Sequence, residues 1–282
     1  MATVGLLHPG EMGAAVGGCL VSVGHEVLWD PAGRSRATTG RALASELTGA
    51  GFDRLIAKSS VIFSICPPHA ALDVAQQVAE TGYAGLYVDA NAISAATAEQ
   101  VAATVKAGGA TYVDGGIIGP PPEVAGHTRF YLSGPQANEV RPLFSRSRLD
   151  ARIAEGPLYA ASSVKMAYAA WTKGSSALLL AARALARASG VERTLLAEWQ
   201  LSQPALTAQS ERSASAAASK GWRWIGEMEE IAASMSAAGL PDGFHEAAAD
   251  LYDRASRAEV PTGRKTATTA KETLDAIMSA LA

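Results

Sequence analysis

Two glycines near the start of the chain are spaced so that the backbone there could approach a phosphate. Gly10 and Gly13 have the spacing of a tight turn that opens a helix, and they follow an apolar run, residues 4–7, that suits a buried strand. Residues 14–23 are small and apolar, which favours a helix. Such a turn lets a pyrophosphate come close, and the helix N-terminus supplies N–H groups and a positive dipole end. The stretch predicts the first unit of a dinucleotide-binding βαβ fold.

The glycine fingerprint is incomplete, because a histidine stands where the GxGxxG pattern has its first glycine. We expect the whole turn to contact the cofactor, through His8, Pro9, Gly10, Glu11, Met12 and Gly13. The alternative is a glycine turn that only packs a helix on a sheet. His8 itself is interpreted as a turn residue rather than a catalyst.

The second strand is predicted at residues 26–30, and its end carries signals for both nicotinamide cofactors. Asp30 lies 20 residues after Gly10, near where an acidic residue would bind a ribose 2′-hydroxyl. The turn that follows contains Gly33, Arg34 and Ser35, with a second arginine next to them. A guanidinium beside a hydroxyl suits a 2′-phosphate, so we expect NADP to be preferred over NAD. The alternative for these arginines is solvated loop charge.

Further strands are predicted at residues 61–66, 86–89, 111–113 and 129–132, with helices at 40–50, 70–81 and from Ser94 through Val105. Ser94 is a plausible helix N-cap. The strand at 61–66 ends at Cys66, Pro67 and Pro68, and loops at the carboxyl ends of central strands contact ligands in doubly wound sheets. We therefore expect these three residues to bind cofactor. The alternation of short strands and helices predicts a mostly parallel sheet covered by helices.

The chain changes character near residue 157, which predicts an α/β domain over 1–157 and an all-α domain over 158–282. The latter begins with one long helix over 160–189, and further helices are expected at 192–202, 204–218, 222–238, 243–257 and 264–281. The long helix is so apolar that it should be buried on most sides. We therefore expect a homodimer built on the helical domain.

Composition narrows the functional class. The chain has 282 residues, 48% apolar and 18% charged, with a net charge of −3, which gives no reason to expect a nucleic-acid partner. The opening apolar run is too short for a membrane span and lacks the features of a signal peptide. Cys19 and Cys66 are isolated, as is typical of buried thiols in a reducing compartment, so we expect a cytoplasmic protein without a metal site.

Taken together, these features resemble the β-hydroxyacid dehydrogenase and 6-phosphogluconate dehydrogenase superfamily over nearly the whole chain. The residues that carry the resemblance are 10–13 (GEMG), 88–91 (VDAN), 114–116 (DGG) with Gly119, Lys165 in the long helix, 230–232 (EIA) and 239–241 (GLP). It implies an α/β Rossmann-type N-terminal domain followed by an all-α domain. The chain looks like a divergent branch with a distinctive C-terminal helical domain, and imine reductases are another branch of the same architecture.

The resemblance implies an NADP-dependent oxidoreductase that moves a hydride between the nicotinamide and a small hydroxy acid or related carbonyl compound. Lys165 matches the general acid/base of such enzymes, and a lysine in an apolar setting can exchange a proton with a substrate oxygen. Asn91 and the loop that contains Gly115 and Gly116 would then line the site near the nicotinamide. The alternative for Lys165 is an ordinary surface lysine, and Lys173 is a weaker candidate for its role.

Three departures from the family pattern bear on the substrate. Ala169 stands where the family has an asparagine, Ile118 falls on its substrate-binding serine, and residues 229–230 (EE) replace a Lys-Asp pair. Imine reductases replace the lysine by aspartate or tyrosine, and Tyr168 keeps imine reduction open as an alternative. A catalytically silent NADP-binding protein is a second alternative, supported by the missing asparagine and serine.

Candidate substrate contacts lie in the helical half, in the run 222–230 (WRWIGEMEE) and one histidine. Arg223 could bind a substrate carboxylate, and Glu227 or His245 could bind hydroxyl or amine groups, with Trp222 beside them. The alternative is that aromatic residues here fill a helix interface with solvated charges between them. We expect the partner bound here to be a small-molecule substrate.

Overall fold

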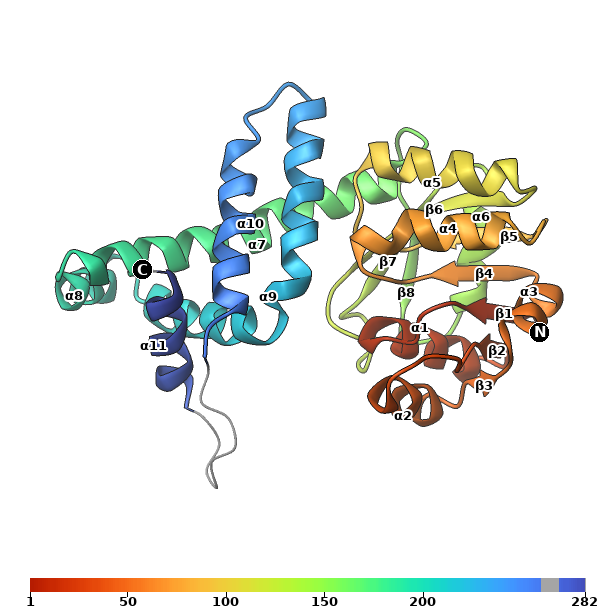
Figure 1. The fold of residues 1–282 in the computed structure, drawn as a ribbon, viewed down its shortest axis with the longest axis horizontal. Helices are drawn as coiled ribbons and strands as arrows, with labels where there is room; N and C mark the ends of the chain where they lie inside the picture. The colour runs from red at the N-terminus through yellow and green to blue at the C-terminus, as the bar shows by residue number, and fades with distance from the viewer. Residues whose placement is uncertain (260–268, 282) are drawn as a thin grey trace. The chain divides into compact units, whose positions relative to one another are not determined.

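The structure, a computed structural model, describes residues 1–259 and 269–281 (Figure 1). Contacts within the chain divide it into two compact units, Met1–Met166 and Ala167–Ala282. The division lies inside the long helix α7 (Ala160–Ala188) rather than at residue 157. The reason is that the first turn of α7 is hydrogen-bonded to the sheet: the backbone N–H of Ser162 donates to Asp114.

The first unit is built on one eight-stranded sheet in the order β3-β2-β1-β4-β5-β6-β7-β8. Its strands are β1 (Thr3–Leu6), β2 (Glu26–Trp29), β3 (Thr48–Gly49), β4 (Val61–Ser64), β5 (Leu86–Asp89), β6 (Thr111–Ile118), β7 (Arg129–Ser133) and β8 (Asp150–Ile153). Neighbours from β3 to β6 are parallel, β6 and β7 are antiparallel, and β7 and β8 are parallel. This topology confirms the predicted α/β sheet. The strand order reverses between β1 and β4, and doubly wound folds bind their ligands at the carboxyl ends of the strands at such a point.

Helices cover both faces of this sheet. They are α1 (Glu11–Ser22), α2 (Arg36–Ala44), α3 (Phe52–Lys58), α4 (Ala71–Ala79), α5 (Ala95–Ala107) and α6 (Ala137–Val140). Phe63 of β4 packs in a core with α1, whereas its neighbour Ile62 packs in a second core with α4 and α5, which lie side by side in Figure 1. All four residues of β4 are buried, as expected for a central strand covered on both faces.

Several boundaries in this unit differ from the predictions. The helix predicted at 40–50 is α2, which begins earlier because Ser35 caps it by accepting a hydrogen bond from the Thr38 N–H at 3.2 Å. It ends before Glu46, whose φ is +57°. The predicted strand at 111–113 continues to Ile118, so the glycines expected in a loop lie in β6. The short elements β3, α3 and β8 have no counterpart in the predictions.

The second unit is helical, as predicted. After α7 it contains α8 (Glu192–Ser202), α9 (Leu206–Ala237), α10 (Gly243–Ser256) and α11 (Ala270–Leu281). The helices α9 and α10 form an antiparallel pair, and α11 packs against α9 (Figure 1). The large buried residues of these helices include Met228, Ile231, Tyr252 and Ile277.

One predicted break in this unit is wrong. Separate helices were expected on either side of Gly221, but α9 runs through that residue without interruption. Gly221 is buried, and a Cβ there would lie 3.4 Å from the carbonyl oxygen of Tyr252, so this glycine faces α10 at close range instead of ending the helix. Part of the helix predicted at 264–281 lies outside the described residues. Within residues 1–259 and 269–281, no helix is both long and apolar enough to cross a membrane.

Candidate active site

The predicted glycine turn joins the end of β1 to the N-terminus of α1. The Gly10 N–H donates to the carbonyl oxygen of His8 at 2.8 Å, and a Cβ on Gly13 would lie only 2.1 Å from that same oxygen. A side chain at position 13 would therefore break the turn, whereas a Cβ on Gly10 would meet nothing within 4 Å. No side chain caps α1, so the N–H groups of its first turn, which begins at Glu11, are oriented to bind an anion.

His8 and Arg34 lie together beside this turn. The Arg34 guanidinium donates to the carbonyl oxygen of Leu7 at 3.1 Å. Burial, followed by the nearby charge of Arg34, lowers the pKa of His8 to about 4, so its imidazole is neutral at physiological pH. His8 Nδ1 and Arg34 Nε are buried atoms for which the described part of the chain offers no hydrogen-bond partner. Two unsatisfied polar atoms beside this glycine turn fit a site that a ligand completes.

The turn after β2 presents the residues predicted to select between NAD and NADP. Asp30 Oδ1 accepts a hydrogen bond from the Ala32 N–H at 3.0 Å, and Gly33 has a φ of +68° that favours glycine. Ser35 is exposed but also caps α2, a role that sequence reasoning missed. Its hydroxyl proton remains a potential donor, because the cap uses the oxygen as acceptor.

The loop after β4 is fixed by Asn91 at the end of β5. Asn91 Oδ1 accepts from the Cys66 N–H at 2.6 Å, and Asn91 Nδ2 donates to Ser64 Oγ at 3.2 Å and Asp89 Oδ2 at 3.0 Å. Both amide protons of Asn91 are used inside the protein. This residue was predicted to line the site, and the structure gives it the task of holding the loop in place.

Cys66, Pro67 and Pro68 follow β4 in this loop, with Pro68 opening a short 3-10 turn before α4. Burial, and then the negative charge of Asp89, raises the pKa of the Cys66 thiol to about 12. The thiol is therefore protonated and a poor nucleophile. Among the described residues no group of three His, Cys, Asp or Glu side chains is arranged to hold a metal ion.

The segment expected as a glycine-rich loop is instead the second half of β6. Gly116 pairs with Tyr131 of β7, and Ile118 pairs with Arg129 and is buried. The prediction of a loop is wrong because antiparallel pairing with β7 satisfies the backbone of both glycines, Gly115 and Gly116. A Cβ on Gly115 would lie 2.6 Å from the carbonyl oxygen of Asp89, so this strand also passes close to the end of β5.

Lys165 lies in the first two turns of α7, directly against β6. A Cβ on Gly116 would lie 3.0 Å from the Cβ of Lys165 and 2.5 Å from the carbonyl oxygen of Ala161. The glycine therefore lets this part of α7 approach the strand. Lys165 is half-buried, whereas Tyr168, in the helical unit, is 45% exposed.

In the helical unit, the structure pairs Glu227 with Lys173. Glu227 is buried in α9, forms an ion pair with Lys173 of α7, and Lys173 Nζ lies 5.7 Å from the centroid of the Trp224 ring. The Tyr252 hydroxyl donates to the Lys173 carbonyl oxygen at 2.7 Å and its ring packs edge-on against Trp224. Glu227 was predicted to bind substrate; its carboxylate already serves as the counter-charge of a lysine.

The other predicted substrate residues range from buried to exposed. His245 is buried, its Nε2 lies 3.4 Å from the carbonyl oxygen of Ala170, and Gly174 gives its ring room. Trp222 is 57% exposed and Arg223 is half-buried. The interpretation that aromatic residues fill a helix interface fits Trp224, which packs against Tyr252, but it does not fit the exposed Trp222.

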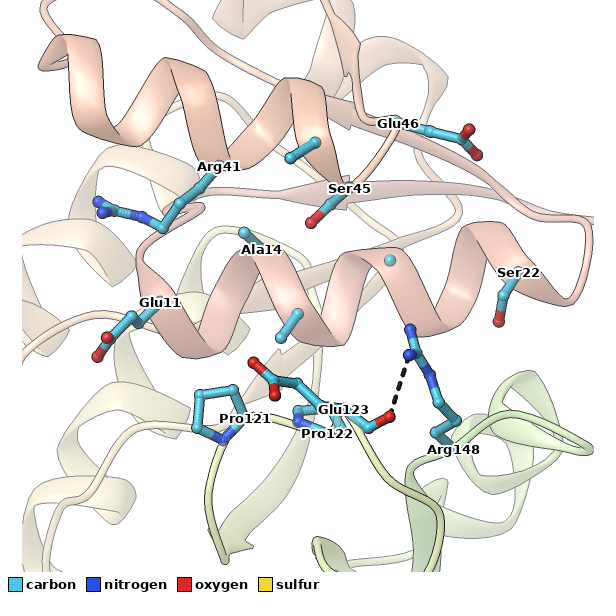
Figure 2. A pocket seen from close by; sticks show the side chains of 13 residues that line it. Glu11, Ala14, Ser22, Arg41, Ser45, Glu46, Pro121, Pro122, Glu123 and Arg148 are labelled. Atoms are coloured by element: carbon cyan, nitrogen blue, oxygen red, sulfur yellow. Dashed lines mark hydrogen bonds between the residues drawn. The ribbon is translucent and has the colours of Figure 1, made fainter.

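A groove of about 460 Å³ runs along the outer face of α1 (Figure 2). Small residues of α1 form its floor, α2 and the segment 121–123 form its walls, and Arg148 closes one end by donating to the Glu123 carbonyl oxygen at 3.1 Å. Of the predicted cofactor residues, Glu11 alone borders it. We therefore assign the candidate site from the glycine turn and its neighbours, not from this groove.

The fold defines the class of protein as a doubly wound α/β domain followed by a helical domain. Residues 186–255 match a family described as a domain of unknown function, DUF1932. No curated protein matches the chain. These findings, with the structures compared next, fit a divergent branch of the β-hydroxyacid dehydrogenase superfamily, as the sequence motifs predicted.

Three solved structures illustrate the likeness. A conserved protein of unknown function, reported to resemble 3-hydroxyacid dehydrogenases, is 25% identical with a TM-score of 0.65, covering 90% of this chain and 97% of that one. The 3-hydroxyisobutyrate dehydrogenase of Mycobacterium tuberculosis is 18% identical, with a TM-score of 0.67 and coverages of 90% and 93%. The Aspergillus terreus reductive aminase in complex with NADPH, cyclohexanone and allyl amine is 19% identical, with a TM-score of 0.56 and coverages of 91% and 94%.

Proposed function

We propose that the protein is a nicotinamide-dependent oxidoreductase that transfers a hydride to or from the carbon of a small hydroxy acid or related carbonyl compound. The observation that carries the proposal is that the first unit contains both a glycine turn after β1 and a lysine, Lys165, packed closely against Gly116 of β6. The 3-hydroxyisobutyrate dehydrogenases that share the fold support the same class of reaction. The free thiols Cys19 and Cys66 support the proposal of a cytoplasmic protein.

The residues around the turn fit a nicotinamide dinucleotide. Gly10 and Gly13 would hold the pyrophosphate at the N-terminus of α1, and the buried, unsatisfied Arg34 Nε and His8 Nδ1 would gain partners on binding. Arg34 and Ser35 favour a 2′-phosphate, so we propose NADP in preference to NAD. When bound, the cofactor supplies the hydride acceptor or donor.

In this proposal Lys165 moves the proton that accompanies hydride transfer. Its ammonium would donate to the oxygen of a carbonyl substrate, and its neutral amine would accept a proton from the hydroxyl in the reverse direction. Lysine suits this role because its ammonium can lose a proton, unlike a guanidinium. Asn91 supports the reaction indirectly by holding the loop that contains Cys66.

Imine reduction is the second candidate. Tyr168 lies three residues after Lys165 in α7 and is partly exposed, so this helix carries a phenol as well as an amine. A reductive aminase and imine reductases are among the proteins that share the fold. In that reaction the hydride would go to the carbon of a C=N bond.

A substrate panel tests the proposal. Purified protein is mixed with NADPH or NADP and with hydroxy acids, 3-oxo acids and cyclic imines, and the nicotinamide absorbance is followed. Turnover of hydroxy or oxo acids supports the first candidate, and turnover of imines alone supports the second. Tight NADPH binding without turnover of any member would instead favour a catalytically silent binding protein.

A further inference from the structure

Asp114, at the point where β6 passes the N-terminus of α7, is buried and fully engaged by that helix and its neighbour strand. Its Oδ2 accepts from the Ser162 N–H at 2.9 Å and from Ser133 Oγ at 2.8 Å, while its Oδ1 accepts from Ser162 Oγ at 2.5 Å. Ser133 Oγ in turn accepts from the Ala161 N–H at 3.0 Å. Two N–H groups in the first turn of α7 are therefore capped by side chains from β6 and β7.

This cap fixes the helix in two ways. A carboxylate at a helix N-terminus forms charge-assisted hydrogen bonds and also opposes the positive end of the helix dipole. The two-point contact with Ser162, through its N–H and its hydroxyl, additionally resists rotation of the helix about its axis. The first turn of α7 thus has a defined register against the sheet.

The same turn is held from a second side by Gly116. Lys165 lies three residues after Ser162, which is nearly one full helical turn, so both residues face the sheet. The close approach at Gly116, 3.0 Å from a Cβ there to the Lys165 Cβ, leaves the lysine backbone little room to shift. The Asp114 cap and the close contact with Gly116 together constrain the position of the Lys165 Cα and Cβ atoms.

We propose that Asp114, acting through Ser162, is the positioning residue that sets the direction of the Lys165 side chain. The inference rests on the proposed function in that Lys165 is the proton carrier, but its geometry is independent of any substrate. Burial raises the pKa of Asp114 while its hydrogen bonds to Ser162 and Ser133 oppose the rise, so the carboxylate is desolvated at a cost.

The first test measures the Lys165 amine without any enzymatic turnover. Full-length protein is treated with a limiting amount of acetic anhydride, and acetylation of Lys165 is compared by mass spectrometry with that of Lys58, an exposed lysine on α3. Ser162→Ala and Asp114→Asn should each change the Lys165 rate by roughly threefold to tenfold, as expected from loss of one hydrogen bond, and leave Lys58 unchanged. Ser162→Ala alone suffices if Asp114→Asn does not fold.

The matched control is Ser94→Ala, which deletes the same atom from the N-cap of α5, where Ser94 Oγ accepts from the Thr97 N–H at 3.2 Å. It should affect neither lysine. Equal Lys165 rates in wild type, Ser162→Ala and Asp114→Asn would overturn the proposal, and so would an equal change in Ser94→Ala, since that would indicate a general loss of stability.

Kinetics then separate this inference from the proposed function. On a substrate found in the panel, Ser162→Ala should lower kcat by roughly tenfold without changing the KM for NADPH, and should cost nothing further in a Lys165→Ala background. Full additivity in that background would contradict positioning through Lys165. If Lys165→Ala keeps its turnover while Ser162→Ala still changes Lys165 acetylation, the positioning is correct and the proton-transfer role of Lys165 is wrong.

Discussion

The Arg34 guanidinium reaches back across the chain to the carbonyl oxygen of Leu7, 3.1 Å away at the end of β1. This contact places the arginine of the β2–α2 turn beside the glycine turn, where the 2′-phosphate side of a dinucleotide would be expected. We predict that NADPH binds about tenfold to a hundredfold more tightly than NADH, as one charge-assisted phosphate contact allows. Arg34→Ala should remove most of this preference.

Dissociation constants of both cofactors, measured by fluorescence for wild type and variant, check this prediction. Arg54→Ala removes an exposed arginine from α3 and is the matched control, which should keep the preference. Equal affinities of the wild type for NADPH and NADH would assign the ribose contact to Asp30 instead.

His8 should make the stability of the protein depend on pH. Its pKa is lowered from 6.5 to about 4 in the folded protein, so the unfolded chain takes up a proton first as the pH falls. The stabilising contribution is present above pH 6.5 and is lost progressively as the pH falls toward 4. Relative to His8→Gln, the wild type should lose roughly 2–3 kcal/mol of unfolding free energy across this window.

Urea unfolding at several pH values measures this difference. His69→Gln is the control for loss of an imidazole from an exposed position. Parallel stability curves for wild type and His8→Gln would show that the folded protein accepts a proton on His8 as easily as the unfolded chain does.

The outer surface of α7 supports the proposal of a homodimer. Trp171, Leu178 and Leu185 recur every seven residues and are 76%, 55% and 69% exposed. A row of large apolar side chains at this spacing is typical of a helix–helix contact. We predict a solution mass near twice the 29.0 kDa of one chain.

Leu178→Glu should shift the mass measured by light scattering toward that of one chain, because it places a charge in the row. Leu43→Glu, at an exposed leucine on α2, should not change the mass. A wild type that already has the mass of one chain at micromolar concentration would contradict the proposal.

The ion pair between Lys173 and Glu227 should matter for stability rather than for substrate binding. Glu227→Ala removes the counter-charge of a mostly buried ammonium, which typically costs about 3–5 kcal/mol. The double variant Lys173→Met/Glu227→Leu should recover much of this loss, since it leaves no buried charge. Glu229→Ala changes an exposed carboxylate on the same helix and is the control.

Chemical denaturation measures these stabilities. If Glu227→Ala leaves the stability unchanged and raises the KM for the substrate, the structural role is contradicted and Glu227 binds substrate as the sequence predicted.

Local patterns predicted much of the fold. The apolar run of β4 and the glycine turn before α1 are strong short-range signals, and Ser94 is the N-cap of α5 as expected. The errors occur where distant partners decide the local structure. Gly116 would suit a loop, but pairing with β7 makes it part of β6, and Gly221 looks like a helix end until α10 packs against it.

The sequence predicted individual residues of the candidate site but not the hydrogen bonds and ion pairs between residues that are distant in the chain. Lys165 and the glycine turn follow from motifs. Nothing near Asp114 in the sequence indicates that it caps α7, because its partners Ser133 and Ser162 are 19 and 48 residues away. The ion pair of Glu227 is hidden for the same reason, as Lys173 lies 54 residues earlier in the chain.

The most direct test of the account is the turnover of Lys165→Ala on the substrate that the panel identifies. We predict that kcat falls by about 10²–10⁴-fold while the dissociation constant of NADPH stays the same, because the residues proposed to hold the cofactor are Gly10, Gly13 and Arg34. Lys165→Arg should not restore activity, since a guanidinium stays protonated. Near-wild-type turnover of Lys165→Ala would contradict the central claim and would make Tyr168 and imine reduction the next hypothesis to test.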